Sequence, residues 1–157
     1  MNFKKNKRLI IAEIGSVHDG SFGNAIKAID LAKKCGANVV KFQTHDAKAE
    51  TTKLAPNPSY FNLENRYDYF KRTSFSLEQW KKLRRHAKDN KILFSSSPFS
   101  IKSLNLLLKI NVDFIKIASG EVTNLELLKK ISRSKMPVIL STGMSSWEEI
   151  NNAYNIL

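Results

Sequence analysis

The sequence predicts an α/β fold in which parallel strands alternate with helices. Apolar runs of strand length alternate five times with amphipathic stretches of helical length along the 157 residues. Several of the helical stretches open with capping signals, and three of the apolar runs carry a charged side chain near the carboxyl end. Such regular alternation implies right-handed crossovers between parallel strands of one sheet.

The expected elements follow one another as five strand–helix units. The expected strands are 8–14, 38–44, 92–96, 113–118 and 137–141. The expected helices are 22–35, 76–90, 101–110, 124–134 and 145–157. One long connection, 46–73, is rich in aromatic residues, and we expect a short helix over 63–71 within it, because structureless loops of this length are uncommon.

Capping residues define several helix ends. Ser76, with Gln79 three residues later, matches a capping box, and Asn124 is a candidate N-cap. Gly36 marks the end of the first helix. Cys35 precedes it and is expected to be a small packed thiol rather than a nucleophile. As the single cysteine, it excludes an internal disulfide and a cysteine-based zinc site.

Two architectures fit this order: an open doubly wound sheet, or part of an eight-stranded barrel. No Gly-x-Gly-x-x-Gly pattern follows the first strand, which argues against a dinucleotide site. A barrel needs eight units and typically about 250 residues, and this sequence offers five units. An incomplete barrel would leave the first and fifth strands as unpaired edges, with Ile11 and Val39 exposed on its inner face.

The composition is that of an ordinary globular domain. Hydrophobic residues make up 42% and charged residues 25% of the chain. No apolar run approaches the ~20 residues of a membrane helix, and the run after the charged N-terminus is too short for a signal peptide. We therefore expect a cytoplasmic protein without membrane contact.

The net charge is +12, from 26 Lys and Arg against 14 Asp and Glu. A charge of this size permits nucleic acid, a membrane surface or anionic substrates as partners. Lysine and asparagine are both abundant, which is typical of a coding-composition bias, and the lysines are scattered over the expected helices. The scatter favours a solvated surface, and we expect no nucleic-acid partner.

Three expected strands carry a charge near the carboxyl end: Glu13, Lys41 and Lys116. Fully buried parallel strands normally consist of continuous apolar residues. Because side chains alternate between the two faces of a strand, the apolar neighbours of each charge occupy the opposite face, which must pack on the helices. The charged face, which Gln43 shares with Lys41, should point inward as in the lumen of a barrel.

These charges need partners, because a buried unpaired charge costs several kcal/mol. An ion pair between Glu13 and one lysine would leave one ammonium group, which an anionic ligand would satisfy. Hydroxyl groups, which suit phosphate and carboxylate oxygens beside lysine, gather past the same strand ends: Thr44, Ser95, Ser96, Ser97, Ser119, Ser141 and Thr142. Barrel active sites lie at this end of the strands, so the pattern favours an anion-binding site over a purely structural ion pair.

Five motifs in order resemble the sialic acid synthase (N-acetylneuraminate synthase) family, which includes legionaminic acid, pseudaminic acid and spore-coat polysaccharide synthases. The motifs are IAEIG at 11–15 with His18 and Gly20, VVKFQTH at 39–45, FSSSPF at 94–99, KIASGEVTN at 116–124 and PVILSTGM at 137–144. The resemblance runs from about Arg8 to the last residue. The ordered set is far more specific than any single motif.

The resemblance implies a TIM (β/α)8-type barrel that condenses phosphoenolpyruvate with an N-acetylated amino sugar, such as N-acetylmannosamine. The products would be a nonulosonic, sialic-type acid and phosphate, used in surface polysaccharide biosynthesis. The resemblance also implies a divalent metal, Mn²⁺ or Mg²⁺, as a Lewis acid for the sugar aldehyde, and a homodimer in the complete form.

The resemblance assigns roles to seven residues. Phosphoenolpyruvate-binding positions are matched by Lys41, Ser97, Lys116 and Ser119, with Ser97 standing where threonine is more usual. Sugar-contacting positions are matched by Gln43 and Glu121, and the acidic position beside the reacting centre by Glu13. Glu13, Lys41 and Lys116 are thus the candidate catalytic residues, and Gln43, Ser97, Ser119 and Glu121 the candidate substrate-binding residues.

The three histidines indicate the function less clearly than the residues of the five motifs. His18 belongs to a motif usually written Asn-His, but Val17 replaces the asparagine here, so a structural role and a site role both stay open. His45 and His86 are expected to be structural or surface groups.

The sequence also departs from the family. The resemblance covers only the N-terminal part of the barrel, so we expect residues 1–157 to lack the remaining βα units and the C-terminal antifreeze-like domain. The resemblance places the metal-binding histidines in those later units, so we expect no metal ligands here and a chain incomplete for catalysis. Two alternatives stay open: an inactive fragment that only binds or associates, and a different barrel lyase that uses Lys116 as a Schiff-base nucleophile.

Overall fold

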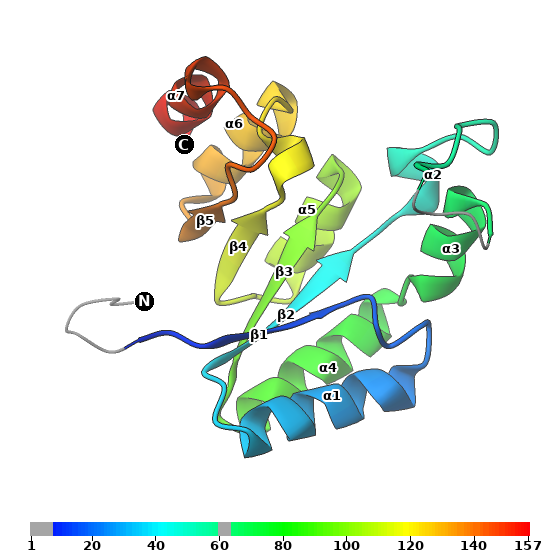
Figure 1. Cartoon of the computed structure of the whole chain (residues 1–157). Helices are drawn as coiled ribbons and strands as arrows, with labels where there is room; N and C mark the ends of the chain where they lie inside the picture. The colour runs from blue at the N-terminus through cyan, green and yellow to red at the C-terminus, as the bar shows by residue number, and fades with distance from the viewer. Residues whose placement is uncertain (1–7, 60–63) are drawn as a thin grey trace.

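The computed structural model describes residues 8–59 and 64–157, which form a parallel five-stranded sheet with helices between the strands (Figure 1). The strands are β1 (Ile11–Gly15), β2 (Val39–Thr44), β3 (Leu93–Pro98), β4 (Phe114–Ile117) and β5 (Val138–Leu140). They pair in the order β1-β2-β3-β4-β5, and every pair is parallel. A doubly wound sheet reverses its order at a switch point, whereas this sequential order is that of a barrel wall. The fold is therefore a partial TIM-type barrel, as predicted.

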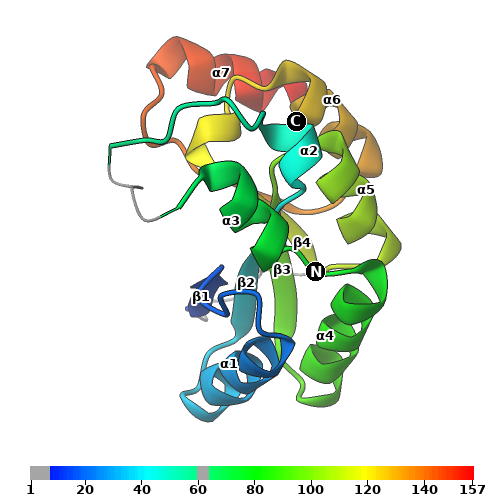
Figure 2. The ribbon, with the colours of Figure 1, turned by 90° about the vertical axis from the view of Figure 1, so that its right-hand side faces the viewer.

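A helix follows each strand, as the alternation predicted. The crossover and final helices are α1 (Phe22–Lys34), α4 (Leu77–Asp89), α5 (Ile101–Lys109), α6 (Leu125–Ser134) and α7 (Trp147–Ile156). The long connection between β2 and β3 holds two short helices, α2 (Ala47–Glu50) and α3 (Arg66–Thr73), and a 3₁₀ turn, η1 (Ser119–Glu121), follows β4. The short helix expected over 63–71 corresponds to α3, although residue 63 lies outside the described residues. Figure 2 shows α2 and α3 together above the carboxyl ends of β2 and β3.

The predicted caps are confirmed, but the expectation for the cysteine is wrong. Ser76 and Gln79 form a complete capping box at the start of α4, and the Asn124 side chain accepts a hydrogen bond from the Leu127 amide at the start of α6. Cys35 is exposed rather than packed. The reason is its position: it is the C-cap of α1, beyond the last buried turn of the helix.

The apolar face of the sheet packs on the helices, as the alternation of side chains required. Val40, Phe42 and Ile115 are fully buried and belong to one core cluster. Phe42 stacks on Phe94 with 5.2 Å between ring centroids, and its edge meets the Trp80 ring of α4 at 5.8 Å. Full burial of a side chain such as Phe42 contributes about 1.5–3 kcal/mol, so this face fixes which residues point to the other side.

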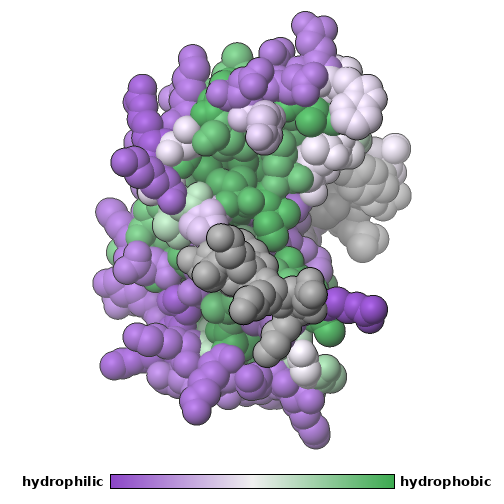
Figure 3. All heavy atoms as spheres, turned by 90° about the vertical axis from the view of Figure 1, so that its left-hand side faces the viewer, coloured by the Kyte–Doolittle hydropathy of each residue, from purple (hydrophilic) through white to green (hydrophobic). Residues whose placement is uncertain are grey.

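The opposite face is less exposed than expected. Val39 was expected to be exposed there, but its side chain is fully buried. In the sheet register, Val39 lies between Ile11 of β1 and Leu93 of β3, and these two half-buried neighbours shield it. Figure 3 shows the side of the molecule on which β5 lies in Figure 1, and apolar residues gather in its middle.

We expect the purified 157-residue chain to self-associate. β1 and β5 are the two edges of the sheet, and Met144, Trp147 and Tyr154 beside β5 are each more than three-quarters exposed. Unpaired strand edges and exposed apolar side chains both favour pairing with another chain. Light scattering over a concentration series checks this, with Trp147→Glu expected to reduce the mass. A monomer at every concentration would contradict the expectation.

None of the helices in the described part of the chain is long and apolar enough to cross a membrane.

Candidate functional site

The predicted charges of β1 and β2 meet near the carboxyl end of the sheet. Glu13 and Lys41 are partners in the strand register, and the Lys41 Nζ lies 2.7 Å from a Glu13 carboxylate oxygen. The Lys41 ammonium also donates to the Ser97 hydroxyl at 3.3 Å, on β3. The lysine side chain is buried, whereas the glutamate side chain is 54% exposed. Three adjacent strands thus place one polar group each at a common point.

Lys116, on β4, adds a second ammonium group to this point. Burial lowers the pKa of Lys116, and the positive charge of Lys41 lowers it further, while the negative charge of Glu13 partly offsets both effects. In the described part of the chain, Lys116 has no ion pair. Among the described residues the arrangement is an ion pair plus one ammonium group with no ion-pair partner of its own. A bound anion would favour the charged form of Lys116.

Several of the hydroxyl groups at the strand ends hold the sheet together instead of facing a ligand. The Thr44 and Ser96 hydroxyls share a buried hydrogen bond of 2.7 Å, which links β2 to β3. The Ser95 hydroxyl donates to the Phe114 carbonyl oxygen at 2.9 Å. Buried hydroxyls require such partners. Of these β3 serines, only Ser97 contacts a candidate catalytic group.

Gln43 lies two residues beyond Lys41 on β2. Its side-chain oxygen accepts a hydrogen bond from the Ser16 hydroxyl at 3.3 Å. Ser16 was not among the hydroxyl groups predicted from the sequence, although this serine follows a strand end as the predicted ones do. This contact ties the loop after β1 to the candidate sugar-contacting residue.

Ser119 and Glu121 lie on η1, directly after β4, and within the described ranges neither of them forms a hydrogen bond or an ion pair with Lys41. The Glu121 carboxylate accepts from the Asn124 side-chain amide at 2.8 Å. Burial raises the pKa of Glu121, and this hydrogen bond partly counteracts the rise. Asn124, expected only as a helix cap, therefore also orients a candidate substrate-binding carboxyl group.

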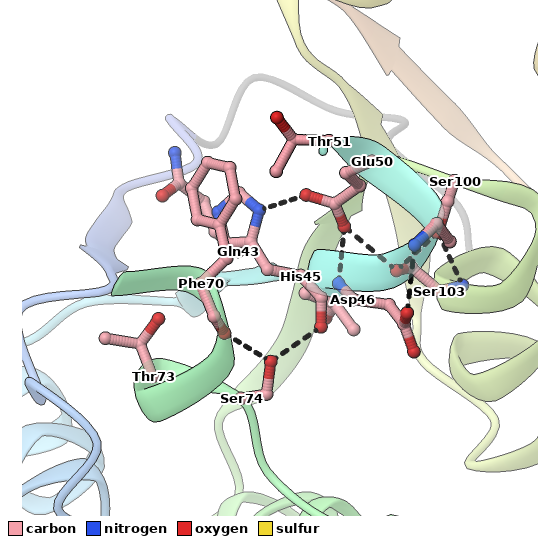
Figure 4. A network of polar contacts seen from close by, with 12 residues as sticks. Gln43, His45, Asp46, Glu50, Thr51, Phe70, Thr73, Ser74, Ser100 and Ser103 are labelled. Atoms are coloured by element: carbon pink, nitrogen blue, oxygen red, sulfur yellow. Dashed lines mark hydrogen bonds and ion pairs between the residues drawn. The ribbon is translucent and has the colours of Figure 1, made fainter. Parts of the chain in front are cut away.

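A buried histidine–carboxylate pair anchors the chain just after β2 (Figure 4). The His45 Nδ1 lies 2.7 Å from a Glu50 oxygen, and each side chain is only 6% exposed. The imidazole is stacked between Phe70 and Phe99, with centroid distances of 4.1 and 4.4 Å. The Ser74 hydroxyl donates to the His45 carbonyl oxygen at 3.0 Å. His45 is thus a structural group, and it fixes the chain two residues after Gln43.

His18 is buried in the loop after β1. Its Nδ1 accepts from the Gly20 amide at 3.1 Å, and its ring lies 4.5 Å from the Phe75 ring. Its Nε2 is buried and has no hydrogen-bond partner within the described residues. These contacts seat the loop that carries Ser16.

Lowering the pH should destabilise the fold through His18. Burial lowers the pKa of His18, with Asp19 opposing and His45 adding to the effect. A histidine whose folded pKa lies below the unfolded value of about 6.5 binds its proton more readily in the unfolded state. The free energy of unfolding should therefore fall as the pH drops below about 6.5.

Urea unfolding between about pH 7 and 5 measures this dependence. His18→Gln should flatten it. His86→Gln, on α4 where the imidazole pairs with Asp30 of α1, should not have that effect. An NMR titration of His18 with a midpoint at or above that of a free histidine would contradict the interpretation.

The described residues do not fit the divalent metal that the resemblance implies. Within 8–59 and 64–157, no three His, Cys, Asp or Glu side chains gather closely enough to hold a metal ion.

A parallel, sequentially ordered sheet with lysines from two strands near its carboxyl end defines part of a TIM-type barrel scaffold. The chain belongs to the NeuB family, whose model matches residues 28–157.

Named relatives support this membership. The chain is 40% identical over 156 residues to the N,N'-diacetyllegionaminic acid synthase of Campylobacter jejuni, covering 96% of this chain and 47% of that protein. It is 38% identical over 145 residues to the N-acetylneuraminate-9-phosphate synthase of Drosophila melanogaster, covering 90% and 39%. A crystal structure of the N-acetylneuraminic acid synthetase of Leptospira borgpetersenii, in complex with citrate, matches with a TM-score of 0.81 at 32% identity, covering 96% and 50%. The chain thus spans half the length of these proteins or less.

Proposed function

We propose that this chain supplies the phosphoenolpyruvate-binding wall of a synthase that condenses phosphoenolpyruvate with an N-acetylated amino sugar. The products are a nonulosonic, sialic-type acid and phosphate. The observation that carries the proposal is the Glu13–Lys41–Ser97 contact set with the ammonium of Lys116, which has no ion pair among the described residues, beside it. The names of the synthases among its relatives support the same reaction class.

The charges of the site match the charges of phosphoenolpyruvate. The substrate carries a phosphate and a carboxylate, and Lys41 and Lys116 would each hold one of these groups by charge-assisted hydrogen bonds. Ser97 and Ser119 add hydroxyl donors. Glu13, paired with Lys41 and half exposed, would orient a water molecule or carry a proton at the reacting carbon. These roles together confine the substrate at the carboxyl end of the strands.

The sugar side of the proposal rests on Gln43 and Glu121. Both are polar groups near strand ends, and both are held by hydrogen bonds, to Ser16 and Asn124 respectively. Glu121, which is half-buried and oriented by Asn124, would accept hydrogen bonds from sugar hydroxyls. In this proposal the enzyme is cytoplasmic, works as a homodimer with a divalent metal held outside the described residues, and serves surface polysaccharide biosynthesis.

The test is keto-acid formation by the protein expressed from its whole gene, with phosphoenolpyruvate, Mn²⁺ and N-acetylmannosamine or a related amino sugar. Phosphoenolpyruvate binding by the 157-residue chain is measured separately by calorimetry. Keto-acid formation that Lys116→Ala abolishes would support the proposal. Binding without turnover would favour a fragment that only binds, and no binding and no turnover would refute the proposal.

The second candidate is a barrel lyase that forms a Schiff base on Lys116. The lowered pKa of Lys116 favours the neutral amine that such chemistry needs. Borohydride reduction in the presence of a keto substrate distinguishes the two reactions: a covalent adduct on Lys116 would support the lyase, and we expect none.

A further inference from the structure

Four lysines from three helices line a cavity away from the candidate active site. The cavity has a volume of about 550 Å³ and is lined by the start of α2, by α3, by the link from α3 to α4, and by α5. Neither Glu13, Lys41 nor Lys116 lines it. Its volume is within the range of small-molecule sites, roughly 300–1,000 Å³.

The lining is strongly basic. Lys48 comes from α2, Lys71 from α3, and Lys102 and Lys109 from α5. The lining contains one carboxylate, Asp46, and its oxygen is already 2.7 Å from the Lys102 ammonium.

The remaining lysines of the lining are not neutralised. No ion pair with another described residue is found for Lys48, Lys71 or Lys109. An arrangement of several like charges around one concavity concentrates counter-ions there.

The rest of the lining determines the size and chemistry of the ligand. Tyr67 and Asn105 bring a hydroxyl and an amide to the cavity, and Phe75, Leu77 and Leu106 bring apolar surface. A lone phosphate ion would leave this apolar part uncovered. The lining therefore suits an organic molecule that carries two or more negative charges and has some apolar surface.

The inner wall of the cavity is rigid. His45 lines it, and this imidazole is fixed by Glu50 and by its stacking on Phe70 and Phe99 (Figure 4). A preformed wall lowers the ordering cost of binding. Glu50 does not line the cavity, and its carboxylate is held by His45 and by the Asp46 amide, which it accepts at 2.5 Å.

We propose that the cavity between α2, α3 and α5 is a second binding site, which takes a polyanionic organic molecule of the phosphorylated or polycarboxylated class. The site is spatially separate from the proposed phosphoenolpyruvate site, because the two share no residue. It lies on the helix side of β2, whereas the candidate catalytic groups lie on the other side.

Citrate and inorganic phosphate serve as probes in titrations of the ¹⁵N-labelled chain, followed by NMR. We expect citrate to shift the backbone amides of Lys48, Lys71 and Ser103 with a dissociation constant of about 1 mM or below, and phosphate to do so more weakly. The double variant Lys71→Ala, Lys109→Ala should weaken this response about tenfold or more. A matched control, Lys129→Ala with Lys130→Ala on α6, removes the same charge away from the cavity and should leave the response unchanged.

Failure of this proposal is distinguishable from failure of the proposed function. Lys41→Ala with Lys116→Ala should remove the responses around Ser97 and Ser119 but retain those around Lys71. Equal weakening by the cavity and control variants would show diffuse charge attraction and overturn the proposal, as would the absence of any citrate shift near the cavity. Equal affinity for phosphate and citrate would overturn the assignment of an organic ligand.

Discussion

Replacing Lys41 by alanine is expected to weaken phosphoenolpyruvate binding ~10–150-fold, since a charge-assisted hydrogen bond contributes roughly 1.5–3 kcal/mol. The Lys41 ammonium is buried and already oriented by Glu13 and Ser97. The entropic cost of ordering this side chain on substrate binding is therefore small. The substitution should do little damage to the fold, because Glu13 is half exposed and its carboxylate becomes hydrated. Calorimetric titration with phosphoenolpyruvate measures the loss.

Lys116→Ala should cause a loss of the same order, because it removes the ammonium group without a counter-charge. Lys116→Arg should restore binding only in part, since the planar guanidinium presents its donors in a different geometry. Lys129→Ala, at an exposed position of α6, is the control and should bind as the unchanged chain does. Unchanged affinity in both Lys41→Ala and Lys116→Ala would refute the assignment of the site.

Gly20→Ala is expected to lower the free energy of unfolding by about 2–5 kcal/mol. Gly20 has a φ of +81°, and a Cβ built there would lie 2.4 Å from the backbone oxygen of Arg72. The left-handed backbone costs an alanine about 1–2 kcal/mol, and the clash with backbone forces a further shift. The affected loop carries His18 and Ser16. Because the Ser16 hydroxyl donates to the Gln43 side chain, the substitution should also disturb the position of Gln43.

Two other glycines separate the cost of the left-handed backbone from the cost of the clash with Arg72. Gly36 has a φ of +83° with nothing within 4 Å of a built Cβ, so Gly36→Ala should cost only the conformational term, about 1–2 kcal/mol. Gly120 has open space and no positive φ, and its change to alanine should lie within ~0.5 kcal/mol. Urea unfolding of the three variants measures these differences. A cost for Gly20→Ala no larger than that for Gly36→Ala would show that the loop moves freely away from Arg72.

The sequence by itself determined the order of the elements and the two faces of the sheet. The strand–helix alternation is a local pattern, and the core positions Val40, Phe42 and Ile115 follow from the alternation of side chains along each strand. The same argument placed Glu13, Lys41 and Lys116 together, because parallel strands end at one edge. Capping boxes were equally readable, since they depend on residues three apart.

Only the tertiary structure decided which polar groups form hydrogen bonds within the protein and which remain available to a ligand. Ser96 and Ser97 are neighbours in the sequence, yet one hydroxyl holds β2 to β3 while the other faces Lys41. The stacked His45–Glu50 pair and the basic cavity join residues from helices that are distant along the chain. The physical reason is that local patterns fix periodicity and the faces of elements, whereas charge neutralisation and burial depend on which side chains the crossovers bring into contact.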